Sequence, residues 1–273
     1  MLADEGGPSA FVFFVGAMNV ATPVLETRGL TIRFGGHVAV NDVSCAFLPG
    51  SVTAIVGPNG AGKTTYFNLI SGQLPASAGQ VFVKGVDITR LSASARTRLG
   101  LGRAFQLTNL FPNLSVFENV RLAVQARARA GLNLLTLWTD RRDLAHAAVT
   151  VLDRVRLGDK RNSTAGELPH GDQRKLEVAL LIALEPDVFM FDEPTAGMSV
   201  DEVPNVLEII GELKRDAAKT ILLVEHKMDV VRSLAERIVV LHNGQLVADG
   251  PPTEVMASAI VREAYLGQEL EDE

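Results

Sequence analysis

The chain has 273 residues and a mass of 29.3 kDa, and its 26 basic and 32 acidic residues give a formal charge of −6. Hydrophobic residues make up 47%, which supplies material for a core and excludes a disordered chain. The single cysteine, Cys45, excludes a scaffold held by intrachain disulfides. The acidic balance also argues against a dedicated nucleic-acid binder, which needs positive charge to meet phosphate.

The N-terminal segment has the length of a membrane span, since residues 6–25 carry no charge. Only residues 10–18 are continuously apolar, however, and Asp4 and Glu5 precede them where a signal peptide would be positive. We therefore expect residues 1–23 to be an extension that is either disordered or the product of a misassigned start, with Met18 as the true first residue. No other segment has the apolar length to span a bilayer.

The first part of the chain alternates between strand and helix patterns. A β-branched run at residues 51–56 is typical of a strand buried on both faces. A glycine-rich turn and a helix over residues 65–72 follow it. The predicted strands cover residues 25–34, 38–48, 51–56, 81–83, 87–88 and 102–106, with turns at Gly35-Gly36 and Lys84-Gly85.

The middle of the chain, residues 115–156, is rich in Ala, Leu and Arg and has no strand-like run. Apolar residues recur there at helical spacing in two groups, separated by residues 131–138. The groups are Val116, Val120, Ala123 and Val124, and then Leu144, Ala148, Val151, Leu152 and Val155. The pattern predicts two helices inserted into the chain.

An α/β pattern returns beyond residue 158. Helices are predicted over residues 172–184, 202–214 and 228–235, strands over 188–191 and 220–224, and a hairpin at 238–248 around His242-Asn243-Gly244. The acidic end, residues 269–273, is expected to fray. The chain thus reads as an α/β core that carries an inserted helical region.

One motif in the core has strong chemical meaning. Residues 57–65, Gly57-Pro58-Asn59-Gly60-Ala61-Gly62-Lys63-Thr64-Thr65, match G-x-x-x-x-G-K-[ST] between a predicted strand and a predicted helix. Such a loop curls its backbone N–H groups around phosphate at a helix N-terminus. Lys63 would reach the β- and γ-phosphates, and Thr64 would be a ligand of Mg²⁺.

A second candidate lies where the apolar strand 188–191 ends in Asp192 and Glu193. The carboxyl ends of strands in an open α/β sheet are where ligands bind. Asp192 would hold Mg²⁺ through its coordination shell, and Glu193 could orient and polarise an attacking water. An acidic pair alone is more often a solvated turn, so the phosphate loop is what gives this pair its meaning.

With these motifs, the sequence resembles an ATP-binding-cassette (ABC) ATPase. Gln106 matches the family's Q-loop, His226 its switch histidine, and Phe34 the aromatic that stacks on adenine. Residues 196–199 occupy the D-loop position, and the signature position holds Leu168-Pro169-His170-Gly171-Asp172-Gln173. The motifs stand in family order from Phe34 to His226, which excludes an accidental match.

The resemblance implies a P-loop NTPase core of RecA type with an antiparallel β subdomain and an inserted α-helical subdomain. The ABC ATPase domain would cover residues 24–250, with the helical subdomain at about 107–178 and a C-terminal tail over 251–273. ATP and Mg²⁺ are the implied cofactors. Glu193, His226 and Lys63 would be catalytic, and Thr64, Gln106 and Asp192 would serve the metal. ATP would be bound by Phe34, Gln106 and residues 57–65, and the signature of a second subunit would complete the site.

Three residues, two in the signature and one in the D-loop, depart from the family pattern at the contact with the second subunit. Pro169 replaces the usual serine and His170 the first glycine of the signature, and Ser199 replaces the D-loop aspartate. Pro169 has neither a hydroxyl nor a backbone N–H, so one donor to the partner's γ-phosphate is lost. We expect ATP binding to be retained, and a catalytically weak, nucleotide-gated regulatory subunit is the alternative reading.

Local matches are similar to the branched-chain amino acid importer type, as in Arg33-Phe34-Gly35-Gly36 and residues 102–106, 173–179, 224–229, 249–255 and 264–267. Urea-type importers and the lipopolysaccharide-export ATPase are alternatives. A soluble ABC protein of translation or repair is disfavoured, because the chain has one phosphate loop and no sustained heptads. The resemblance implies two transmembrane permease subunits, a second ATPase subunit as homo- or heterodimer, and a periplasmic solute-binding protein. The chain would lie on the cytoplasmic face of the plasma membrane.

Overall fold

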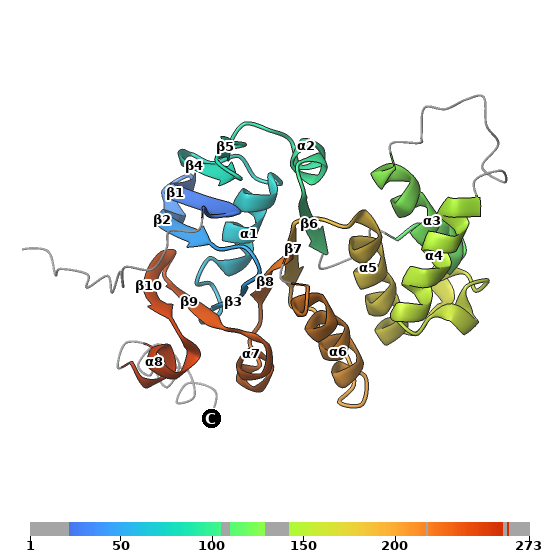
Figure 1. Ribbon diagram of the computed structural model, residues 1–273. Helices are drawn as coiled ribbons and strands as arrows, with labels where there is room; N and C mark the ends of the chain where they lie inside the picture. Colours follow the sequence, from blue (N-terminus) through green and yellow to red (C-terminus); the bar gives the residue numbers. More distant parts are fainter. Residues whose placement is uncertain (1–21, 105–109, 129–141, 217, 259–260, 262–273) are drawn as a thin grey trace, which may run out of the picture.

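The computed structural model describes residues 22–104, 110–128, 142–216, 218–258 and 261. In these ranges the chain forms two β-sheets, an antiparallel sheet and a larger central sheet, and the helices pack around the central sheet (Figure 1). Within the described residues, no helix is both long enough and apolar enough to cross a membrane.

The first sheet is antiparallel and has the order β2-β1-β4-β5. Its strands are β1 (Leu25–Phe34), β2 (His37–Phe47), β4 (Ala78–Val83) and β5 (Val86–Asp87). Hairpins join the consecutive strands β1 and β2, and β4 and β5, as the two predicted turns require. Its buried side chains pack on the helix that follows the phosphate loop, α1 (Lys63–Ser71), through Tyr66, Phe67 and Ile70.

The second sheet has the order β10-β9-β3-β8-β7-β6 and is parallel except at the β9–β10 edge. Its strands are β3 (Val52–Val56), β6 (Leu101–Ala104), β7 (Val188–Asp192), β8 (Thr220–Val224), β9 (Arg237–His242) and β10 (Gln245–Gly250). All five residues of each of β3, β7 and β8 are buried, as expected for strands covered on both faces.

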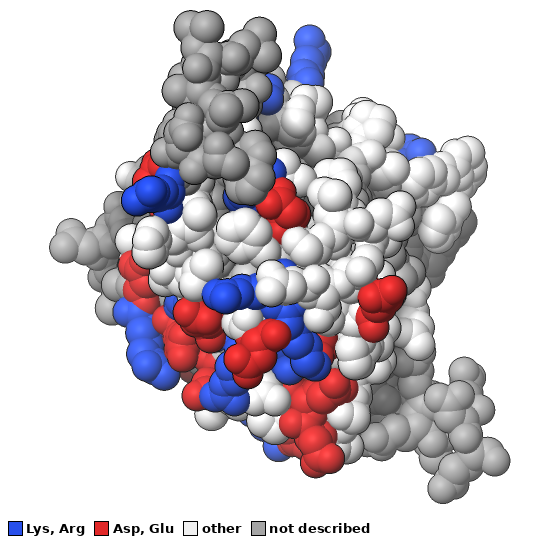
Figure 2. All heavy atoms as spheres, turned by 90° about the vertical axis from the view of Figure 1, so that its right-hand side faces the viewer, with Lys and Arg blue, Asp and Glu red and all other residues white. Residues whose placement is uncertain are grey.

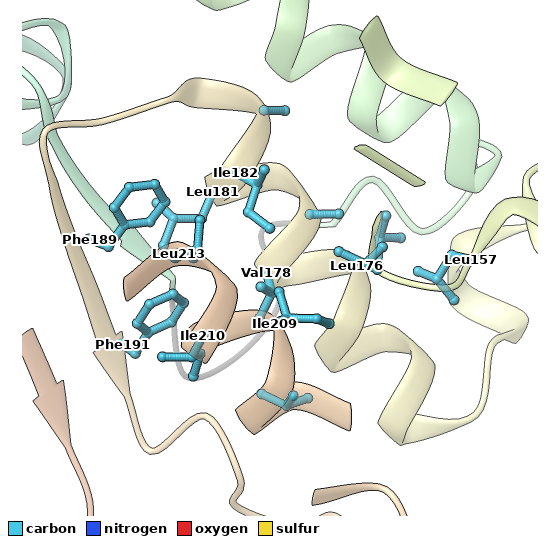
Figure 3. Packing of buried hydrophobic residues seen from close by; sticks show 14 of the residues in the cluster. Leu157, Leu176, Val178, Leu181, Ile182, Phe189, Phe191, Ile209, Ile210 and Leu213 are labelled. Atoms are coloured by element: carbon cyan, nitrogen blue, oxygen red, sulfur yellow. The ribbon is translucent and has the colours of Figure 1, made fainter. Parts of the chain in front are cut away.

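Alternation along the central strands divides the core in two. Phe189 and Phe191 of β7 face the cluster of α5 (His170–Leu184) and α6 (Val203–Lys214), whereas Val188 and Met190 face α1 and the antiparallel sheet. In Figure 3 the two phenylalanines point from β7 toward these helices, and their rings stack with centroids 6.2 Å apart. Because successive side chains of a strand point to opposite faces, β7 packs against the helices on one face and against α1 and the antiparallel sheet on the other.

The inserted helical region consists of α3 (Val116–Arg127), α4 (Arg142–Arg154) and α5, with short 3₁₀ turns at Gly158–Lys160 and Ala165–Glu167. Its apolar side chains, such as Val120, Leu152 and Leu176, belong to the same cluster as Ile210 of α6. These helices form the right-hand side of Figure 1, and the face they present in Figure 2 mixes basic and acidic side chains. Arg156–Glu208 and Arg154–Glu212 are ion pairs that join this region to α6.

Most predicted elements are present, with shifts at their ends. Helix α1 begins at Lys63, two residues before the predicted start, and α5 begins at His170. Residues 105 and 106 of the strand predicted over 102–106 lie outside the described residues, as do 1–21, 131–138 and 269–273. Two short helices were not predicted, α2 (Ala93–Arg98) and α8 (Pro252–Ala257).

The remaining helix, α7 (Met228–Leu234), packs beside α8 and against β9. Val255 of α8 and Val261 are buried with Val231 and Val240, so the first part of the expected tail belongs to the core.

Candidate functional site

Three loops meet at one edge of the central sheet. The phosphate loop follows β3, the loop with Asp192 and Glu193 ends β7, and the loop with His226 follows β8. In the sheet order β3, β8 and β7 are adjacent and parallel, so their carboxyl ends lie side by side. Residues that are far apart in the sequence are thereby brought to the edge where an open α/β sheet binds ligands.

The phosphate loop needs glycine at two positions for steric reasons. Gly57 has φ 152° and Gly62 has φ 96°, values that favour glycine. A Cβ at Gly57 would collide with the carbonyl oxygen of Leu241, and one at Gly62 with that of Ala39. The loop is thus fitted between neighbouring backbones and leads directly into α1, whose first turn has no side-chain cap. The N–H groups of such an uncapped turn suit an anion.

Lys63 lies inside this loop with only 6% of its surface exposed. Its ammonium donates hydrogen bonds to the carbonyl oxygens of Gly57, at 2.6 Å, and Pro58, at 2.8 Å. Burial lowers the pKa of Lys63, while the nearby charges of Glu193 and Asp192 oppose that shift. The loop therefore concentrates a cation next to the acidic strand end.

Asp192 is held from one side by an arginine. Arg103 of β6 donates to Asp192 Oδ2 at 2.5 Å, and the two side chains are 5% and 0% exposed. Burial raises the pKa of Asp192, although the charge of Arg103 and its hydrogen bond lower it. The other oxygen, Oδ1, is buried and has no hydrogen-bond partner among the residues that the structure describes. A buried carboxylate oxygen left unpaired beside a phosphate loop fits a ligand of Mg²⁺.

Glu193 and His226 contact each other directly. The Nε2 atom of His226 lies 2.8 Å from Oε1 of Glu193, with both side chains partly exposed. Glu193 has a left-handed backbone, φ 51°, and its N–H donates to the carbonyl of Val224 at the end of β8. A strained conformation of this kind is common at functional sites, and here it turns the carboxylate toward the β8 loop.

A second contact joins the same two loops. The Thr195 hydroxyl donates to Glu225 Oε1 at 2.5 Å, and Glu225 Oε2 accepts hydrogen bonds from the N–H groups of His226 and Lys227 at 3.0 and 3.3 Å. Thr195 and Glu225 are 1% and 3% exposed. This buried contact was not predicted from the sequence.

The signature residues cap helix α5. Pro169 is its N-cap, and its carbonyl accepts from the N–H groups of Asp172 and Gln173. Asp172 pairs with Lys160 and Lys175, and these lower its pKa against the opposing effect of burial. Gln173 donates to the carbonyl of Leu168 at 2.9 Å.

The D-loop packs against this helix start. Ser199 donates to Glu202 Oε2 through its hydroxyl, at 3.0 Å, and its N–H. A Cβ at Gly171 would collide with Glu202, and one at Gly197 would meet His170 at 3.0 Å. Pro169, His170 and Ser199, the three departures from the family pattern, therefore lie in one local structure.

The structure brings together the phosphate loop, Asp192, Glu193 and His226, whereas the other predicted residues lie apart or are not described. Phe34 ends β1 and is 49% exposed, which leaves its ring free to stack. Gln106 lies outside the described residues. Arg103, Thr195 and Glu225 were missed, because nothing in their spacing distinguishes them from ordinary polar residues.

Comparisons with known proteins agree over most of the chain. Residues 40–196 match the ABC transporter family, and residues 245–271 match the branched-chain amino acid ATP-binding cassette transporter family. The high-affinity branched-chain amino acid transport ATP-binding protein LivG of Escherichia coli K12 is 36% identical over 91% of this chain and 100% of its own length. BraF of Pseudomonas aeruginosa, described in the same terms, is 35% identical over the same shares.

Solved structures show the same fold. The ADP conformation of MJ1267, an ATP-binding cassette of an ABC transporter, superimposes with a TM-score of 0.77 at 28% identity. The match covers 90% of this chain and 100% of that one.

The sheet order, the phosphate loop and the acidic strand end define a P-loop ATPase with an added antiparallel subdomain. ATP hydrolysis in this class serves a coupled process, and here that process is transport. The chain belongs to the ABC transporter family, as an ATP-binding cassette of the branched-chain amino acid transporter type. The predicted fold class, family and ATPase activity are confirmed.

Proposed function

We propose that the chain powers the import of branched-chain amino acids through two transmembrane permease subunits. The support is the match to LivG and BraF over their full length, together with the match of residues 245–271 to the branched-chain family. These matches favour the branched-chain amino acid importer over the urea-type and lipopolysaccharide-type alternatives. The chain would act at the cytoplasmic face of the membrane, with a solute-binding protein delivering the amino acid to the permeases.

Within one subunit, the phosphate loop would bind the phosphates of ATP, and Phe34 would stack on the adenine. Lys63 would exchange its bonds to the loop carbonyls for bonds to the β- and γ-phosphates. Thr64, Asp192 and Gln106 would hold Mg²⁺, and the unpaired Oδ1 of Asp192 supports that role. The metal would neutralise charge on the phosphates.

One observation carries the proposal of hydrolysis: the 2.8 Å contact between His226 Nε2 and Glu193 Oε1 beside the phosphate loop. In this arrangement Glu193 can accept a proton from a water that attacks the γ-phosphate. His226 fixes the orientation of that carboxylate and can donate to a γ-phosphate oxygen. The contact between the two loops thus gives Glu193, as the base, and His226, as the donor to phosphate, defined positions.

A second ATPase subunit would complete the site. Each subunit would offer the start of its α5, with Pro169 to Gln173, to the ATP held by its partner in a head-to-tail dimer. Pro169 removes one donor, so the remaining N–H groups at the start of α5 would face the anion. In a heterodimer the partner would supply its own signature to this chain's ATP.

The regulatory alternative rests on Pro169, His170 and Ser199 alone. These residues serve the partner's nucleotide, whereas Lys63, Asp192, Glu193 and His226 are present for this chain's own. We therefore propose an active hydrolytic site.

Glu193→Gln tests the assignment of the base. The variant is expected to bind ATP with unchanged affinity and to hydrolyse it at least about a hundredfold more slowly, because the amide cannot accept the proton. The measurement is steady-state ATP hydrolysis by the assembled transporter, together with nucleotide binding by the full chain. Glu208→Gln on α6, an exposed site, is the matched control and should retain full activity. Unchanged turnover of Glu193→Gln would refute the assignment.

A further inference from the structure

Glu225 is a buried carboxylate that the hydrolytic scheme does not use. It is 3% exposed and lies directly before His226, and its hydrogen bonds to the described residues run to the loops that carry Glu193 and His226. We propose that Thr195 and Glu225 form a clamp that holds Glu193 and His226 at their working distance. Both are positioning residues, and the inference rests on the proposed roles of Glu193 and His226.

The Thr195 half of the clamp lies two residues after Glu193. Its hydroxyl is buried and donates to Glu225 Oε1 at 2.5 Å. The N–H of Ala196 donates to the carbonyl of Glu193, which closes a tight turn around Thr195. Movement of Thr195 would therefore be transmitted to Glu193 through this turn.

The Glu225 half acts on the backbone of the β8 loop. Oε2 accepts from the N–H groups of His226 and Lys227, so one carboxylate fixes the peptide units on both sides of His226. Below the clamp, Asp192 of β7 lies opposite Val224 of β8 in the sheet. Strand pairing fixes the ends of β7 and β8 relative to each other. The Thr195–Glu225 contact holds the two loops that follow these strands in the same way, beyond the last paired residues.

The clamp explains how Glu193 and His226, two partly exposed side chains, keep a defined contact. His226 and Glu193 are 39% and 23% exposed, and a contact between such groups is weak by itself. The loss of a buried hydrogen bond such as that between Thr195 and Glu225 is more costly, because the remaining partner is left unsatisfied away from water. Rigid loops would pre-position the base and the histidine, which affects the chemical step more than the binding of ATP.

The test compares Thr195→Val, which removes the hydroxyl with little change in shape, with Thr195→Ser, which keeps it. Thr195→Val is expected to lower kcat by about tenfold or more and to leave the KM for ATP within about twofold. Thr195→Ser should retain wild-type kcat. Glu225→Leu should resemble Thr195→Val, because a hydrocarbon side chain cannot accept from the N–H groups of His226 and Lys227. The double variant should be no slower than the worse single one.

Hydrogen exchange supplies a readout that does not depend on turnover. The amides of His226 and Lys227 should exchange faster in Thr195→Val and Glu225→Leu, and at the wild-type rate in Thr195→Ser. Exchange is measured on the full chain, and kcat and KM on the assembled transporter. Melting temperatures of all variants identify any that are merely unstable.

Three outcomes would overturn the clamp: wild-type kcat in Thr195→Val, additive losses in the double variant, or unchanged exchange at residues 226 and 227. Glu193→Gln, measured alongside, separates this result from the proposed function. If Glu193→Gln is slow and Thr195→Val is not, the clamp fails and the hydrolytic site stands. If Glu193→Gln turns over normally, the assignment of the base fails instead.

Discussion

Cys45 of β2 is 5% exposed, and its side chain packs in the hydrophobic cluster between the antiparallel sheet and α1. Its backbone N–H donates to the Thr27 hydroxyl, which also bonds the Tyr66 hydroxyl at 2.8 Å. Burial raises the pKa of Cys45 to about 12, an effect that the nearby Arg237 partly offsets. Since the thiolate is the reactive form, the folded protein holds this side chain inert.

We predict that native protein at pH 8 does not react with a thiol reagent, whereas the unfolded chain reacts with one equivalent. The unfolded thiol ionises at about pH 8.5, so the free energy of unfolding should decrease as the pH rises from there toward 12. Labelling with and without guanidinium, followed by mass spectrometry, measures the reaction. Rapid labelling of native protein would show that the thiol is accessible.

Among single residues, those of the motifs can be predicted from the sequence, whereas the residues that support them cannot. Lys63 and Glu193 are marked by spacing and by their place after a buried strand. Arg103 bonds Asp192 from 89 residues away, and Glu225 bonds Thr195 from 30 residues away. Such pairs depend on which strands are neighbours, and a single sequence carries no direct signal of that.

Among the elements, α1 depends on an arginine from another helix. Arg96 of α2 is 2% exposed and donates to the carbonyls of Leu69 and Ile70, at 2.7 and 2.6 Å, near the end of α1. It also donates to the carbonyls of Thr89 and Leu91. These contacts satisfy the terminal carbonyls and place positive charge at the helix C-terminus, where it is favourable.

Arg96→Met should therefore lower the free energy of unfolding by about 2–4 kcal/mol, because several buried carbonyls lose their donor. Urea unfolding followed by circular dichroism gives the value. Arg98→Met on the same helix removes an exposed charge and should change stability by less than about 0.5 kcal/mol. Equal effects of the two substitutions would show that the capping contacts contribute nothing.

Long or strongly patterned elements were the predictable ones. The strand Leu25–Phe34 has the predicted bounds, and α6 begins one residue after its predicted start. Helices α2 and α8 have six residues each, which is too short for a periodic pattern. The order β3-β8-β7 was beyond prediction, because strand pairing depends on tertiary packing.

For the molecule as a whole, Arg237 ties the two sheets together. It makes two hydrogen bonds of 2.5 Å to Asp249 across the β9–β10 edge and donates to the Ala46 carbonyl of β2. Its guanidinium also lies 5.8 Å from the centre of the Phe47 ring. One side chain thus joins the antiparallel sheet to the central one.

Arg237→Met is expected to cost about 2 kcal/mol of stability, because Asp249 and the Ala46 carbonyl lose a charged donor. Arg28→Met is a matched control, since Arg28 also pairs with a carboxylate, Glu26, and stacks on Phe82, but is 59% exposed. Its loss should cost less than about 1 kcal/mol. Thermal unfolding of both variants gives the comparison, and equal shifts would contradict a special role for the inter-sheet contact.

The strand order also determines at what point of its synthesis the chain can complete the central sheet. Val52 of β3 lies opposite Ile221 of β8, so the phosphate loop is translated long before the strand that supports it. The ribosome must deliver the inserted helices and β7 before β8 can enter between β3 and β7. A nascent chain that stops short of β8 would expose apolar sheet surface and require protection by chaperones.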